Sequence, residues 1–243
     1  MADRTTESPA PRVTRGRALR VAGEEIVLLP ERAAWWPARR TLVVADLHLG
    51  KESTFRAAGI PIPDGVLDEA LARLARIADA CGAERVVVAG DLVHARRGLT
   101  PDVVERVAAW RATFAGRIEL VDGNHERGVT IPAAWRIDRR PAYEADGPFA
   151  YAHEPPATQS DGLGPACGYR WCGHLHPTVR VGRTALPAFV IARDHAILPA
   201  FTAFARGVAT WSDASTDGST DAPTGRRVYA VVEGNVVEIP PRA

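Results

Sequence analysis

The feature that most constrains the fold is an alternation of buried strands with amphipathic helices over residues 41–121. Three continuous, β-branched apolar runs have the character of strands covered on both faces, and they are Thr41–Asp46, Arg85–Gly90 and Arg117–Val121. Between the first two runs, residues 66–78 place apolar side chains at helical spacing, and Gly82 provides a stop. Before the third run, Thr100 and Pro101 begin a second helix. This alternation predicts a parallel sheet.

The strand signals on either side of this region are shorter. An apolar run at Glu25–Leu29 precedes it, and after Gly128 the runs are separated by turns without a long helix. These later runs are Pro148–Ala152, Tyr169–Gly173, Ala188–Ala192, Val228–Val232 and Val236–Ile239. The change of pattern predicts a second, more antiparallel sheet that packs on the first.

The chain is expected to form a single domain over residues 19–243. Residues 1–18 are polar and without periodicity, which predicts a flexible N-terminal arm, and residues 212–226 predict a flexible acidic loop. The three cysteines are too few for a disulfide framework. The sequence has no 18-residue apolar run, and the first 18 residues contain no apolar signal segment. We therefore expect a cytoplasmic protein that has no contact with a membrane.

Polar side chains follow the predicted strands in five short clusters. The clusters are Asp46-Leu47-His48, Gly90-Asp91, Gly123-Asn124-His125-Glu126, His153 and Gly173-His174-Leu175-His176. In open α/β sheets ligands bind at the carboxyl ends of strands. Imidazole, carboxylate and carboxamide groups together suit zinc, manganese or iron. In an extended chain, residues two apart such as Asp46 and His48, or His174 and His176, point the same way and can share one ion.

The series D-x-H, G-D, G-N-H-E, H and G-H-x-H resembles the calcineurin-like metallophosphoesterase superfamily. The resemblance implies an α/β fold in which two mixed β-sheets pack as a sandwich flanked by helices, in α/β/β/α order. It also implies a role for each matching residue: Asp46, His48 and His176 hold one metal ion, Asn124, His153 and His174 hold the other, Asp91 bridges both, and His125 is an acid that binds neither.

The chemistry of such a site explains these residue types. Two ions about 3.5–4 Å apart can clamp the attacking and leaving oxygens of a phosphoryl displacement, and a water between them becomes hydroxide near neutral pH. The expected activity is hydrolysis of phosphodiester bonds by this bridging hydroxide, with Asp91 and His125 as catalytic residues. Manganese is the expected ion, with iron, zinc and cobalt as alternatives. The net charge of +1 predicts no general attraction to nucleic acid, so the metal pocket would attract phosphate.

A finer resemblance surrounds the first cluster. The segments DLHLGK at 46–51, FRAAGIPIP at 55–63 and LPAF at 198–201 are similar to the bacterial ligase-associated metallophosphoesterases, described as DNA damage response endonucleases. This implies DNA as the substrate and a functional association with a DNA ligase and a helicase in DNA repair. After Phe201 the chain departs from the usual glycine-rich stretch. Lys51 and Arg56 are expected to contact a substrate phosphate.

Two alternative functions remain open from the sequence. A small-molecule phosphoesterase, acting on a nucleotide, a cyclic nucleotide or a sugar-lipid pyrophosphate, would use the same site chemistry. A metal-binding scaffold without catalysis is the second alternative, and the retention of His125 with all seven ligand positions argues against it. The roles of His94, His195 and Glu126 are also open, between support of the site and an ordinary turn or surface position.

Overall fold

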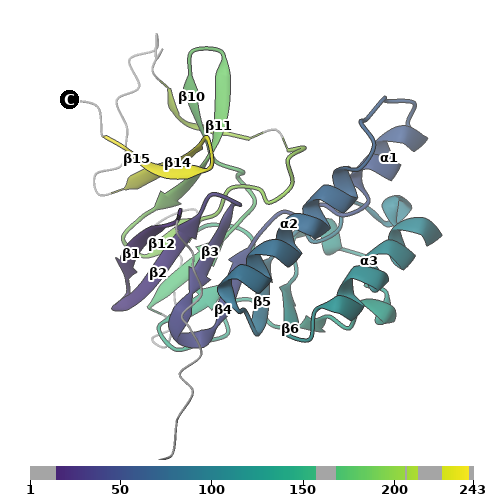
Figure 1. The fold of residues 1–243 in the computed structure, drawn as a ribbon, viewed down its shortest axis with the longest axis horizontal. Helices are drawn as coiled ribbons and strands as arrows, with labels where there is room; N and C mark the ends of the chain where they lie inside the picture. Colours follow the sequence, from purple (N-terminus) through teal and green to yellow (C-terminus); the bar gives the residue numbers. More distant parts are fainter. Residues whose placement is uncertain (1–14, 157–167, 206, 213–225, 241–243) are drawn as a thin grey trace, which may run out of the picture.

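Two mixed β-sheets form the centre of the fold in the computed structural model, which describes residues 15–156, 168–205, 207–212 and 226–240 (Figure 1). The first sheet has seven strands, in the order β1 to β7. Their bounds are β1 Arg17–Val21, β2 Glu24–Leu29, β3 Ala33–Trp36, β4 Thr41–Val44, β5 Arg85–Ala89, β6 Arg117–Val121 and β7 Asp138–Arg139. Strands β1 to β4 pair antiparallel, and β4 to β7 pair parallel. The predicted parallel arrangement of β4, β5 and β6 is therefore confirmed.

The structure describes three α-helices, of which the sequence predicts the second and the third. They are α1 Lys51–Ala57, α2 Val66–Cys81 and α3 Pro101–Thr113, and the short 3₁₀ turns are η1 Pro37–Arg39, η2 Arg96–Gly98, η3 Asn124–Glu126 and η4 Ala133–Trp135. Helix α2 ends at Gly82, which has a φ of 61°, and the Thr100 side chain caps α3 by accepting from the N–H of Val103 at 3.4 Å. The predicted start and stop signals are thus confirmed.

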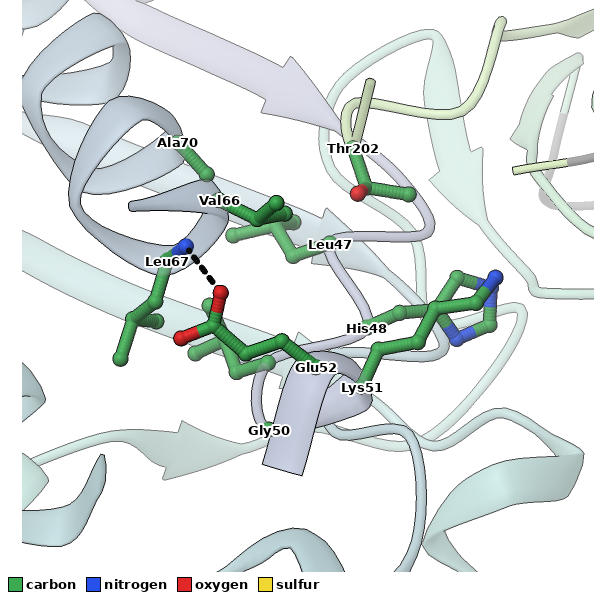
Figure 2. Close-up of a pocket in the computed structure, with 10 residues that line it drawn as sticks. Leu47, His48, Gly50, Lys51, Glu52, Val66, Leu67, Ala70 and Thr202 are labelled. Carbon is green, nitrogen blue, oxygen red and sulfur yellow. Dashed lines mark hydrogen bonds between the residues drawn. The ribbon is translucent and has the colours of Figure 1, made fainter. Parts of the chain in front are cut away.

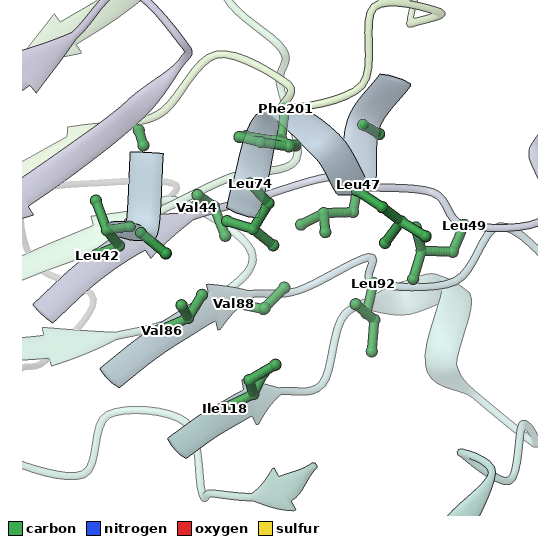
Figure 3. Close-up of a cluster of buried hydrophobic side chains, with 14 of the residues drawn as sticks. Leu42, Val44, Leu47, Leu49, Leu74, Val86, Val88, Leu92, Ile118 and Phe201 are labelled. Carbon is green, nitrogen blue, oxygen red and sulfur yellow. The ribbon is translucent and has the colours of Figure 1, made fainter. Parts of the chain in front are cut away.

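The parallel strands are apolar throughout because both of their faces are buried. Leu42 and Val44 of β4 pack with Leu74 of α2 in the core between the helices and the first sheet (Figure 3). Val43, which points the other way, belongs to the core between the two sheets. In that second core, Trp36 of β3 meets Phe149 of β8 (Phe149–Tyr151) edge to face, with ring centroids 4.7 Å apart. This two-sided burial joins the sheets into a sandwich.

The second sheet has eight strands in the order β13-β10-β11-β12-β9-β8, with β14 and β15 added beside β11. Besides β8 they are β9 Tyr169–Cys172, β10 Thr178–Val181, β11 Thr184–Ile191, β12 His195–Ile197, β13 Ala209–Ser212, β14 Arg227–Val232 and β15 Asn235–Ile239. β11 pairs antiparallel with β10, β12 and β14, whereas β9 pairs parallel with β8 and β12. The expected fold class of two mixed sheets is confirmed. Among the described residues the α-helices all precede Gly116, and α2 and α3 cover the first sheet.

Several expected boundaries are shifted or untested. Strand β1 begins at Arg17, inside the expected flexible arm, and residues 1–14 lie outside the described residues. Most of the expected acidic loop also lies outside them, since β13 ends at Ser212 and the description resumes at Arg226. Within the residues that the structure describes, no helix has both the length and the apolar character needed to cross a bilayer.

Helix α1 is attached to the loop after β5 by a close backbone approach. Leu49 forms a short parallel bridge with Val93, and the N–H of His94 donates to the carbonyl of Leu49 at 2.9 Å. A Cβ on Gly98 would lie 2.3 Å from the carbonyl oxygen of Gly50, which is too close for any side chain. Glycine at this contact therefore lets α1 and η2 pack together.

Replacing Gly98 with Ala should lower the free energy of unfolding by about 1–3 kcal/mol, because the added methyl group meets backbone that cannot move aside. Urea unfolding followed by circular dichroism measures this. Gly168→Ala is the matched control, since its added Cβ would meet only the carbonyl of Pro148 at 3.4 Å, an ordinary contact. Equal stability of the two variants would contradict this view of the α1–η2 contact.

Candidate metal centre

Five of the seven predicted ligand residues have a left-handed backbone. The φ angles are 57° at Asp46, 49° at His48, 51° at Asp91, 72° at His174 and 46° at His176. The interpretation that pairs two residues apart point together from an extended chain is therefore wrong, because β4 ends at Val44 and β9 at Cys172. Residues other than glycine rarely adopt this conformation, and it concentrates at functional sites.

Backbone hydrogen bonds hold these turns in place. The N–H of Asp46 donates to the carbonyl of Gly90 at 3.1 Å, and the N–H of His48 donates to the carbonyl of Asp91 at 2.9 Å. The N–H of His174 donates to both carboxylate oxygens of Asp46, at 3.1 and 3.2 Å. The last contact links the two sheets directly at the site.

The first group of predicted ligands converges around Asp46. Its Oδ1 lies 3.3 Å from Nε2 of His176, and the Nε2 atoms of His176 and His48 are 3.4 Å apart. Asp46 and His48 are buried. The side chains predicted to hold the first ion therefore meet, although they come from different sheets.

The second group converges around His153. Its Nε2 lies 2.9 Å from Oδ1 of Asn124 and 3.1 Å from Nδ1 of His174. Oδ2 of Asp91 lies 3.3 Å from Nε2 of His153 and 3.9 Å from Nε2 of His48. Asp91 therefore lies between the two groups.

The donor set fits metal ions. Two ligand atoms that each lie about 2.1 Å from one ion can be at most about 4.2 Å apart, and the contacts within each group are shorter than this limit. Two sets of three donors within 4.8 Å of one another consist of predicted ligands. Asp46 with His48 and His176 is the group predicted for the first ion, whereas Asp46 with Asp91 and His153 combines residues of both groups. Facing imidazole nitrogens need either a proton or a cation between them, which a divalent ion supplies.

Burial and hydrogen bonding set the charges of these groups. Burial lowers the pKa of His48 to about 2, against the opposing effect of Asp91, so this imidazole is neutral with a lone pair to donate. Burial also disfavours ionised Asp91, but the hydrogen bond and charge of His153 together with the N–H of His125 more than offset it, and the carboxyl pKa is lowered. For His153, burial favours the neutral ring, but the hydrogen bond to Asp91 together with the negative charges of Asp91 and Asp46 more than offsets it, and the pKa is raised.

His125 lies beside these groups, and His94 orients it. The N–H of His125 donates to Oδ1 of Asp91 at 3.1 Å, and its Nε2 is 3.8 Å from Oδ2 of the same carboxylate. Nδ1 of His125 contacts the carbonyl oxygen of His94, so this nitrogen carries the proton and donates. The rings of His94 and His125 stack with centroids 5.0 Å apart. His94, which the sequence left open, therefore belongs to the surroundings of the site.

Glu126 supports the backbone beneath Asp91. One carboxylate oxygen accepts the N–H groups of Asp91 at 2.9 Å and Gly123 at 2.8 Å, and the other accepts the N–H of Val93 at 3.0 Å. Burial raises the pKa of this carboxyl. The sequence did not distinguish this role from a solvated turn. Its one signal is the position of Glu126 directly after the Asn124–His125 pair.

The two expected phosphate-binding residues lie in different surroundings. Lys51, at the start of α1, borders with His48 a small cavity of about 10 Å³, enough for about one water (Figure 2). Burial lowers the pKa of Lys51, and the nearby carboxylates of Asp46 and Asp91 offset only part of this shift. Arg56 instead donates to Asp64 at 2.6 Å. His195, bonded to Asp194 at 2.9 Å in β12, takes no part in these contacts.

The comparisons with known proteins agree with this fold and site. The family model for the calcineurin-like phosphoesterases matches residues 39–197. The chain therefore belongs to the calcineurin-like phosphoesterase family and is a metal-dependent phosphoesterase. The crystal structure of nuclease MPE from Pseudomonas putida is similar, with a TM-score of 0.73, 30% identity and coverage of 92% of this chain and 100% of that one. The comparison with curated proteins gives no match.

Replacing Glu126 with Gln should lower the free energy of unfolding by about 1–3 kcal/mol and reduce the metal content of the purified protein. The amide nitrogen donates rather than accepts, so at least one of the three backbone N–H groups loses its acceptor. Urea unfolding and elemental analysis measure the two effects. Glu105→Gln is the control, because Glu105 is exposed on α3. The assignment of Glu126 is refuted if both variants behave like the wild type.

Proposed function

We propose that this phosphoesterase hydrolyses phosphodiester bonds with two divalent ions and that its substrate is DNA. The observation that carries the proposal is the position of Asp91, whose Oδ2 lies 3.9 Å from His48 and 3.3 Å from His153. A carboxylate between two ligand groups is suited to bridging two ions, because it has two oxygens. The similarity to a solved nuclease supports a phosphodiester substrate.

The ligand roles follow from the two groups of contacts. Asp46, His48 and His176 would hold one ion, and Asn124, His153 and His174 would hold the other, with Asp91 shared. When bound, the ions would neutralise phosphate charge and acidify the attacking water. Manganese is the proposed ion, because mixed nitrogen and oxygen ligation suits it. The protein contributes by fixing the donors on strained, hydrogen-bonded turns.

His125 would donate the proton to the leaving oxygen. Its Nδ1–H is directed to the carbonyl of His94, which fixes the ring and leaves Nε2 facing the site. A histidine ring held by its Nδ1–H in this way has Nε2 free to carry a second proton and to give it up. This arrangement is the one a general acid requires.

Lys51 is the proposed contact to the substrate phosphate, since its ammonium group interacts with Asp46 and Asp91. Arg56 would need to leave Asp64 to reach a phosphate. The resemblance of residues 46–51 and 55–63 to ligase-associated metallophosphoesterases extends the proposal to DNA repair, with a DNA ligase and a helicase as functional associates.

The proposal is tested by a panel of substrates after reconstitution with Mn²⁺. A nitrophenyl phosphodiester and DNA should be hydrolysed, and a nitrophenyl phosphomonoester should react more slowly. Asp91→Ala should abolish all activity and lower the metal content, because its Oδ2 lies near Nε2 of both His48 and His153 and would be shared by both ions. Asp194→Ala is the matched control, since it removes another Asp bonded to a His outside the site. Two ions per chain and normal turnover in Asp91→Ala would refute the bridge.

His125→Ala should leave the metal content near normal while lowering the turnover of DNA by about 10²–10⁴-fold, the usual contribution of a general acid. The loss should be much smaller for a nitrophenyl diester, because nitrophenolate leaves without needing a proton. Steady-state rates on the two substrates make the comparison. An equal loss on both would assign His125 to electrostatic stabilisation rather than proton donation.

A further inference from the structure

Two exposed arginines beside the metal centre have no acidic partner among the described residues. They are Arg96 and Arg97 of η2, in the loop that follows Asp91. Several other arginines are in ion pairs, namely Arg17 with Glu238, Arg40 with Glu84, Arg56 with Asp64, Arg106 with Asp68 and Arg139 with Asp122. The positive charge of η2 is therefore available to a ligand.

The fold holds η2 at a fixed place relative to the site. The glycine contact between Gly50 and Gly98 packs it against the start of α1, and the N–H of Gly98 donates to the carbonyl of Ala95 at 2.9 Å. His94, two residues before Arg96, stacks on His125.

A layer of flat side chains connects η2 with α1. The ring of Phe55 stacks on His94 at 5.7 Å and 15°, and Nζ of Lys51 lies 5.9 Å from the centre of the Phe55 ring. Lys51 lies against the Phe55 ring of this stack, and Arg96 and Arg97 follow shortly after His94 in the chain. We call these three cations the basic edge.

A single phosphodiester bound at the metal centre would need only the groups that surround Asp91. Cations beyond that reach gain energy only from a substrate with further phosphates, and each phosphate they neutralise releases a condensed counterion. His125 faces the proposed leaving oxygen, and its ring stacks on His94, which lies just before η2 in the chain. The phosphates nearest η2 would therefore belong to the leaving strand.

On the basis of the proposed function, we propose that Arg96 and Arg97 bind the phosphates that follow the scissile one on the leaving side of a polynucleotide. The substrate is then a strand of several nucleotides whose backbone passes from the metal centre across η2, at the arginine end of the basic edge. The two arginines act in binding the strand and take no part in the chemical step.

The test compares the Arg96→Ala/Arg97→Ala double variant with Arg76→Ala/Arg193→Ala, which removes the same charge elsewhere. Arg76 is exposed near the end of α2. Arg193 is exposed beside Asp194, whose carbonyl accepts from Arg170 near the start of β9, so this control lies away from the carboxyl end of β9 where His174 and His176 follow. We would measure kcat/KM on a DNA oligonucleotide from about 50 to 200 mM NaCl, the range over which phosphate binding is most sensitive to salt, and on a nitrophenyl phosphodiester, with Mn²⁺-loaded protein.

The wild type should show a steep decline of kcat/KM on DNA with salt. In Arg96→Ala/Arg97→Ala the log–log slope should be shallower by about 1.4–1.8 units, which is about 0.7–0.9 for each phosphate that is no longer neutralised. The rate on the nitrophenyl diester should be unchanged, which also shows that the variant folds. The control double variant should keep the wild-type slope.

Three results would overturn the inference. An unchanged slope in Arg96→Ala/Arg97→Ala, with a steep wild-type slope, refutes it and leaves the proposed function intact. An equal reduction of the slope in the control variant assigns the effect to net charge rather than to η2. Wild-type protein that hydrolyses the small diester but shows a flat slope or no cleavage with DNA refutes both this inference and the DNA substrate.

Discussion

The hydrogen bonds between His174 and the carboxylate of Asp46 are the contact on which the site depends, because they join the carboxyl ends of strands from different sheets. The backbone must come very close for this contact to form. A Cβ on Gly173 would lie 2.6 Å from Oδ2 of Asp46, so only glycine fits at that point of the motif. The aromatic core between the sheets, with Trp36 against Phe149, sets the separation that makes the approach possible.

The ligand residues are held in a conformation that they would not adopt alone. A left-handed backbone at a residue other than glycine costs of order 1–3 kcal/mol, and five ligand positions have it. The surrounding hydrogen bonds compensate, and Glu126 accepts three of them beneath Asp91. The rest of the fold thus stabilises the arrangement of donors before any ion binds, which is the usual relation between a strained site and its scaffold.

Much of the fold could be predicted because its signals are local. Strands β4, β5 and β6 are continuous apolar runs, and α2 and α3 have helical spacing with recognisable ends. Strands β10, β12 and β13 escaped prediction because they are short and are stabilised by partners outside their own segment of the chain. The sequence does not mark which Asp or His has a positive φ angle. The ligand clusters could therefore be recognised, but their backbone conformation could not.

The distribution of charge on the surface also depends on contacts between distant parts of the chain, which the sequence does not show. The net charge of +1 predicts no basic face, because it only sums charges over the whole chain. It cannot reveal which charges are neutralised, because that depends on pairs such as Arg56 with Asp64 and Arg106 with Asp68 that only the fold brings together. Arg96 and Arg97 are exposed, have no acidic partner among the described residues, and give a local positive field beside a pocket of buried carboxylates and imidazoles. A nearly neutral chain can in this way attract a polyanion at one edge, since the field of a charge is screened within about 8–10 Å and only nearby charges act on the substrate.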